Sequence, residues 1–344
     1  MLSCSLAAAD TLASEPLRIG VVGDMSDRNP TAMATVKAVS FAVEDIRKAG
    51  LLTGDVSIIS RDDQCKSDVA TYIARSFSDQ DRVNLVVGHT CTITSIPASN
   101  IYREKNILQI DPATTHPGLT EGMRGKKSRL FRLAERQDRA AAVAVVVLKD
   151  QIANKNVCLV GGAFSKSWLD RFQALATGTS RQFSVAASLP ERGSGADLCI
   201  VYDPDDRTGL RGLGNRDDVI GAIGLDDRLP NPSTNIDQVR DLTKRLRAAG
   251  YSGPISIAVN AYAAVQVWAV AMKEAGSAEP DKVAEQMHRL KFETIRGLVA
   301  FDEIGDVRQP LITLVRYSNP IIEVPNKCNE APCKDCKCSE CCPK

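Results

Sequence analysis

The hydrophobic residues of this chain follow two patterns that take turns along most of its length. Short apolar runs rich in Val, Ile and Leu have the length and composition of buried strands, and we predict them at 17–22, 56–60, 83–87, 107–110, 157–160 and 198–202. Longer segments between them carry apolar residues at helical spacing, which predicts helices at 31–49, 67–79, 97–105, 140–149, 166–177, 236–249 and 261–275. Strands and helices that alternate in this way predict parallel sheets with helices on both faces.

Four local features complete this prediction. Ser67 precedes a helical pattern and is the expected N-cap of that helix. Residues 255–259 are expected to form a short extended segment, and residues 297–317 a strand, a turn and a second strand. The turn-rich segment 225–235 is expected to be a hinge.

Small hydroxyl residues follow two of the predicted strands, in the stretch from Leu85 to Leu119. The first strand of this stretch is followed by several threonines, and the second by Ala113, Thr114 and Thr115. Hydroxyls and free backbone N–H groups at strand ends and helix starts suit a small polar or anionic ligand. The pattern therefore predicts a binding cleft.

Composition excludes several other functions. The chain has 344 residues, 44% hydrophobic and 25% charged, as in a globular protein with room for about two domains. A formal net charge of +1 gives no electrostatic case for binding nucleic acid or for inserting at an anionic membrane. No apolar run approaches the roughly 20 residues of a membrane span. The chain has only three histidines, and none of its serines or cysteines lies in a nucleophile-elbow context. The sequence therefore gives little support for an enzyme.

Four motifs together carry a family resemblance. They are Arg61-Asp62-Asp63-Gln64-Cys65, Gly88-His89-Thr90-Cys91-Thr92, Asp111-Pro112-Ala113-Thr114-Thr115-His116-Pro117 and the GLVAFDEIGD segment at 297–306. Over 17–135 and 255–318 the chain resembles the leucine/isoleucine/valine-binding proteins of bacterial ABC importers. The resemblance implies a type 1 periplasmic-binding fold, α/β, with two doubly wound parallel-sheet lobes joined by a three-segment hinge. It also implies export to the periplasm, closure over a small polar ligand such as an amino acid or a related carboxylate, and delivery to permease subunits, with only peripheral contact to the membrane.

The resemblance also assigns residues. It implies a disulfide between Cys65 and Cys91, which follow what we take to be neighbouring parallel strands. It places Thr92, Ala113, Thr114 and Thr115 in the ligand cleft, with Thr94 as a further neighbour. The alternative is that these threonines only cap helices, as threonine also does.

The second lobe departs from the family pattern. The family supplies an acidic residue there that pairs with the ligand's ammonium group. In this chain Asp226 is the candidate we adopt, with Asp203 and Asp227 left open, and Phe164 is the candidate aromatic residue. Because burying an ammonium group without a countercharge is costly, a less cationic ligand is an alternative to a free amino acid.

The predicted domain boundaries follow from the same comparison. Residues 1–16 are taken as the remainder of a signal segment or a disordered start. Lobe 1 comprises 17–135 plus 255–285, and a shortened lobe 2 comprises 136–254 plus 286–325. Residues 326–344 form a Cys-rich tail, in which six cysteines lie close together: Cys328, Cys333, Cys336, Cys338, Cys341 and Cys342.

The tail resembles metallothionein clusters, and its Cys-x2-Cys and Cys-x-Cys spacings suit Zn(II) or Cu(I). Disulfide cross-linking and an appendage without function are the competing interpretations. No cofactor is required by the binding fold itself. The leading hypothesis is a solute-binding protein. The alternatives are a metal-handling protein that presents the tail, or a ligand-sensing receptor subunit.

Overall fold

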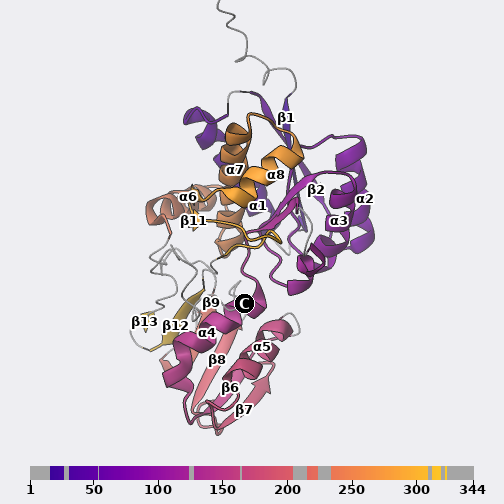
Figure 1. Cartoon of the computed structure of the whole chain (residues 1–344). Helices are drawn as coiled ribbons and strands as arrows, with labels where there is room; N and C mark the ends of the chain where they lie inside the picture. Colours follow the sequence, from indigo (N-terminus) through magenta and orange to yellow (C-terminus); the bar gives the residue numbers. More distant parts are fainter. Residues whose placement is uncertain are drawn as a thin grey trace, which may run out of the picture.

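The computed structural model describes residues 16–26, 31–52, 54–123, 128–162, 165–203, 215–223, 234–308, 312–318 and 322–323. These residues form two α/β lobes, one above the other in Figure 1. Each lobe is built on its own sheet. The predicted arrangement, an α/β protein of two lobes with a largely parallel sheet in each, is confirmed.

The sheet of lobe 1 is parallel throughout, in the order β2-β1-β3-β4-β5. Its strands are β1 (Leu17–Gly23), β2 (Val56–Asp62), β3 (Leu85–Gly88), β4 (Leu108–Asp111) and β5 (Leu130–Arg132). Alternate side chains of each strand enter different cores, so Leu85 and Val87 pack into one and Val86 into the other. Helices therefore cover both faces of this sheet, as the sequence predicts.

One face is covered by α1 (Thr31–Lys48), α6 (Ile236–Ala248), α7 (Ser256–Ala275) and α8 (Pro280–Arg289). The other is covered by α2 (Ser67–Asp79) and α3 (Thr92–Glu104). Figure 1 shows α7 beside α1, and α2 beside α3. Because α7 is apolar on all sides it is buried along most of its length, and it ends at Gly276 in the left-handed region, φ +57°.

Lobe 2 has a mixed six-stranded sheet in the order β13-β12-β9-β8-β6-β7. Its strands are β6 (Asn156–Val160), β7 (Gln182–Ala186), β8 (Leu198–Asp203), β9 (Arg216–Ile223), β12 (Thr313–Tyr317) and β13 (Ile322–Glu323), of which β12 and β13 are antiparallel to their neighbours. Helices α4 (Gln137–Ile152) and α5 (Lys166–Ala176) cover one face. Within the described residues no helix packs on the opposite apolar cluster, so the expectation of helices on both faces holds only for lobe 1.

The predicted division into lobes is wrong at two places. Helix α6 belongs to lobe 1, because Val239, Leu242 and Leu246 share a core with α1 and α7. The hairpin of β10 (Phe292–Thr294) and β11 (Gly297–Val299) and the end of α8 also pack in lobe 1. Residues 234–308 thus all lie with lobe 1. The chain crosses between lobes after β5, after β9 and before β12.

Three local predictions are also corrected. Residues 256–259 form the first turn of α7, because this apolar run packs into the core as a helix. The N-cap of α2 is Lys66, so Ser67 is already helical. The segment predicted as one strand–turn–strand unit is divided, since β11 pairs with β10 and β12 joins the sheet of lobe 2. The predicted hinge at 225–235 falls mostly outside the described residues.

Candidate functional site

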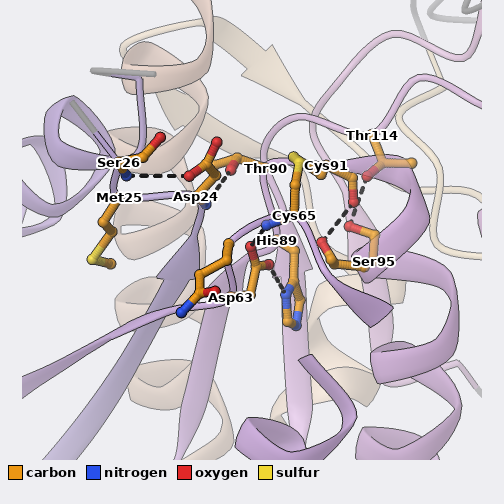
Figure 2. Close-up of a disulfide and its surroundings, with 12 residues drawn as sticks. Asp24, Met25, Ser26, Asp63, Cys65, His89, Thr90, Cys91, Ser95 and Thr114 are labelled. Carbon is orange, nitrogen blue, oxygen red and sulfur yellow. Dashed lines mark hydrogen bonds and ion pairs between the residues drawn. A yellow bond between two sulfur atoms is a disulfide. The ribbon is translucent and has the colours of Figure 1, made fainter. Parts of the chain in front are cut away.

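The carboxyl ends of the lobe 1 strands form the edge that faces the hinge, because β5 leads from this edge into α4. Figure 2 shows the loops at this edge around a disulfide. In parallel sheets ligands bind beyond the carboxyl ends of the strands. This edge is therefore the candidate site.

The predicted disulfide between Cys65 and Cys91 is present, with a Cα–Cα distance of 5.8 Å. We expected the two strands that precede these cysteines, β2 and β3, to be neighbours. That expectation is wrong, because β1 lies between them. Cys65 still reaches Cys91 because it follows Gln64 in a turn where both residues are left-handed, with φ of 52° and 53°. Cys91 is the N-cap of α3, so the bridge fixes the start of that helix.

A buried polar cluster lies beneath the disulfide (Figure 2). The Asp63 carboxylate accepts a hydrogen bond from His89 Nδ1 at 2.7 Å, and His89 Nε2 lies 3.0 Å from the Tyr102 hydroxyl. Burial alone would raise the pKa of Asp63, but the hydrogen bond and charge of His89 hold that pKa below its ordinary value. Burial and the Asp63 charge raise the pKa of Tyr102. Since all three side chains are buried, this cluster supports the loops and does not contact a ligand.

A second buried carboxylate, Asp111, shapes the loop after β4. Its Oδ1 accepts hydrogen bonds from the backbone N–H groups of Ala113 and Thr114, at 2.9 and 2.7 Å, and its Oδ2 accepts one from Ser95 Oγ at 2.6 Å. Burial raises the pKa of Asp111 despite these hydrogen bonds. The loop that holds residues 113–115 is thus folded around an internal carboxylate.

The structure separates the predicted site residues into two groups. Thr92, Ala113 and Thr115 are half-buried at the edge of the sheet. Thr94 and Thr114 are buried, and their hydroxyls donate to the Cys91 carbonyl and to Ser95 Oγ. These two hydroxyls stabilise the loops, so we no longer expect them to contact a ligand. Phe164, Asp226 and the six tail cysteines lie outside the described residues.

Sequence reasoning missed Asp24, which follows β1 at the same edge. Its backbone N–H donates to Thr90 Oγ1 at 3.1 Å, and its Oδ1 accepts from Ser26 N at 3.1 Å (Figure 2). Gly23 permits this approach, because a Cβ there would lie 2.4 Å from Thr90 Oγ1. The sequence did indicate this residue, because Asp24 directly follows the predicted strand at 17–22. The same reasoning was applied to the residues after the strands at 83–87 and 107–110.

An ionic cluster joins two of the three connections between the lobes. Arg132, at the end of β5, donates to Asp306 at 2.8 Å, and both side chains are almost fully buried. Arg136 lies 3.3 Å from the same carboxylate. Arg139, in the first turn of α4, pairs with Asp302 at 2.6 Å. These contacts link the connection after β5 to the one before β12.

Metal ligation and membrane crossing also bear on function. Among the described residues no group of three His, Cys, Asp or Glu side chains is placed to hold a metal ion. The helices in the described part of the chain include none with the length and apolarity needed to cross a membrane.

Several known proteins are similar to this chain in sequence. Residues 16–184 match the model of a periplasmic binding protein family. An "Amino acid binding protein" of Pseudomonas aeruginosa is 27% identical over 88% of this chain and 91% of its own length. "Leu/Ile/Val-binding protein homolog 1" of Brucella melitensis is 28% identical over 82% of this chain and 84% of its own length.

Solved structures agree on the fold. An ABC transporter substrate-binding protein of Desulfitobacterium hafniense in complex with Leu has a TM-score of 0.68 and 20% identity, covering 90% of this chain and 100% of that one. A solute-binding protein of R. palustris in complex with benzoate has a TM-score of 0.67 and 15% identity, covering 90% and 96%. With the sequence matches, these structures confirm the resemblance found in the motifs. In sequence and fold the chain is similar to leucine/isoleucine/valine-binding proteins and to other substrate-binding proteins of ABC transporters.

Proposed function

We propose that this protein is the extracytoplasmic solute-binding component of an ABC importer and that it binds a small carboxylate between its lobes. The observation that carries the proposal is the position of Thr92 in the first turn of α3, beside Ala113 and Thr115 at the end of the neighbouring strand β4. The N-terminus of a helix favours an anion, through free N–H groups and the helix dipole. The half-buried hydroxyls of Thr92 and Thr115 add hydrogen-bonding groups.

The named ligands of similar proteins support a carboxylate. One solved neighbour holds Leu and another benzoate, and these two molecules share little besides a carboxylate and an apolar body. A site whose first lobe recognises the carboxylate serves both.

The mechanism would be closure about the hinge. Ligand contacts made in both lobes favour the closed state, by as much as the ligand's affinity for that state exceeds its affinity for the open one. The closed protein would then dock on permease subunits outside the cytoplasm. This function requires binding and release and no chemical step.

Calorimetry with amino acids and aromatic carboxylates tests the proposal. Thr92→Val and Thr115→Val should each weaken binding by about 1–3 kcal/mol, because each leaves a polar partner unsatisfied. Thr71→Val is a matched control, since Thr71 is half-buried on α2 and donates only to the Asp68 carbonyl. If no carboxylate binds, or if both site variants bind like the control, the proposed site is wrong.

We also propose that the Cys-rich tail binds Zn(II) or Cu(I). The supporting observation is the density of cysteines between Cys328 and Cys342, a spacing that lets several thiolates share one soft ion. Truncation after Val324 should then abolish metal uptake and leave carboxylate binding unchanged. Equal metal uptake by the truncated chain would refute this role for the tail.

A further inference from the structure

We infer that Cys158 and Cys199 form a redox-sensitive thiol pair, which a peroxide converts to a second disulfide that joins two strands of the lobe 2 sheet. The inference goes beyond the proposed function, because it concerns neither the ligand nor the edge of the lobe 1 sheet. Among the described residues these are the two cysteines outside the Cys65–Cys91 bridge, and the structure holds both as thiols.

The register of the lobe 2 sheet brings the two cysteines together. Cys158 on β6 lies directly opposite Cys199 on β8, in a parallel pair of strands. Figure 1 shows these two strands side by side in the lower lobe. Neighbouring strands are about 4.8 Å apart, and the Cα atoms of a disulfide are about 4.4–6.8 Å apart. The backbone therefore already has the spacing that a bridge needs.

Both side chains also point to the same face of the sheet. Cys158 and Cys199 pack in one apolar cluster with Val160 and Val201, whereas the residues on either side of each cysteine pack in the cluster on the opposite face. The Cys199 thiol donates a hydrogen bond to the Cys158 sulfur. Two sulfur atoms already in contact need only a small side-chain rotation to form a bond.

Hydrogen bonding makes Cys158 the more reactive of the two thiols. The hydrogen bond from Cys199 lowers the pKa of Cys158, burial opposes this, and a hydrogen bond with Ser184 lowers that pKa further. Donating the shared hydrogen bond, together with burial, raises the pKa of Cys199. Because the thiolate is the nucleophile in cysteine chemistry, Cys158 reacts first and Cys199 second.

A peroxide supplies the oxidant for the two steps. The Cys158 thiolate attacks one oxygen of hydrogen peroxide, the O–O bond breaks, hydroxide leaves, and Cys158 becomes a sulfenic acid. The sulfur of Cys199 then attacks the Cys158 sulfur and forms the S–S bond, while the sulfenic oxygen leaves as water with the proton of the Cys199 thiol. One peroxide is thus reduced to water and hydroxide as two cysteine sulfurs are oxidised.

The place of the pair in the fold suits a small oxidant. The side chains of Cys158 and Cys199 retain only 2% and 3% of their exposure, which excludes bulky reagents. Hydrogen peroxide is little larger than water, and in the described part of the protein no helix packs over this face of the sheet. Local opening of the face is therefore enough to admit the oxidant. The bridge then fastens β6 to β8 on the face that lacks a covering helix.

Peptide mapping of the full chain by mass spectrometry tests the inference. Native protein is treated with hydrogen peroxide, unfolded in an alkylating reagent and digested with trypsin, which releases the two cysteines on separate peptides. We expect most wild-type molecules to contain the two peptides linked, and dithiothreitol to separate them. Cys199→Ser should instead leave a sulfenic acid at Cys158, which dimedone traps when added with the denaturant. Cys158→Ser should leave Cys199 as a thiol.

Two controls separate this pairing from general oxidation. The same treatment in urea removes the strand register, so the linked peptides should fall at least about tenfold. The bridge closes a loop of about 40 residues, which should raise the midpoint of thermal unfolding of oxidised wild type by about 5–10 °C. Cys199→Ala, which adds no buried hydroxyl, should show no such rise.

Three results would overturn the inference. The first is the absence of linked peptides in native protein whose tail cysteines have been oxidised, since the oxidant was then sufficient. The second is equal linkage in urea, which would show that the fold does not select this pair. The third is a sulfenic acid found at Cys199 in Cys158→Ser but not at Cys158 in Cys199→Ser, which would reverse the order of reaction. Circular dichroism checks that each variant is folded.

Discussion

Removing the Cys65–Cys91 disulfide should lower the free energy of unfolding of the first lobe by about 3.5 kcal/mol. The bridge closes a loop with a sequence separation of 26 residues, and the chain-entropy relation for a loop of that length gives this value.

The perturbation is the double variant Cys65→Ser/Cys91→Ser, and the assay is equilibrium urea unfolding followed by far-ultraviolet circular dichroism. The same variant in dithiothreitol is the control, since the reductant should not destabilise it further. Wild type should lose the same stability when it is reduced. A loss below about 1 kcal/mol would refute the loop-entropy argument. A loss found only in carboxylate affinity would show that the bridge orders the start of α3 and does not stabilise the lobe.

Three other measurements follow from the buried groups. Asp111 has a raised pKa in the folded state, so its contribution to stability is present below its unfolded pKa near 4 and declines as pH rises toward the folded value. Asp111→Asn should remove that decline, and parallel stability curves between pH 3 and 7 would contradict it. Asp306→Ala should cost about 3–5 kcal/mol in urea unfolding, because it leaves Arg132 buried without its partner, and a loss under 1 kcal/mol would exclude a buried pair. Cys158 and Cys199 are buried neighbours on β6 and β8, so an alkylating reagent should modify them only in denaturant, and fast labelling of the native protein would contradict this packing.

Local pattern was enough to predict most strands and helices, because each depends on apolar residues close together in the sequence. It failed where a segment's environment decides its structure. Residues 256–259 belong to a largely apolar run that suits a strand as well as a helix, and their place in the core of lobe 1 as the start of α7 is decided by tertiary packing. Helix α6 has an ordinary amphipathic pattern, which does not reveal that its apolar face packs on lobe 1.

The candidate site was predictable to a similar extent. The hydroxyl clusters and the disulfide could be found from motifs, since they follow strands directly. Thr94 and Thr114 could not be assigned to the interior, because their partners Cys91 and Ser95 are chosen by the fold of the loops. The ion pair of Arg132 and Asp306 joins residues 174 positions apart, and nothing in the sequence near either residue indicates the other.

The connection between the lobes has a mechanical consequence. The Arg132 N–H donates to the Gly305 carbonyl at 2.8 Å, and Arg132 and Asp306 form a parallel bridge. Two of the three crossings therefore begin side by side, joined by main-chain bonds and by a buried ion pair that salt screens weakly. Sliding one past the other would break those contacts, whereas bending both together preserves them. A movement of the lobes that keeps these contacts would therefore bend both crossings together.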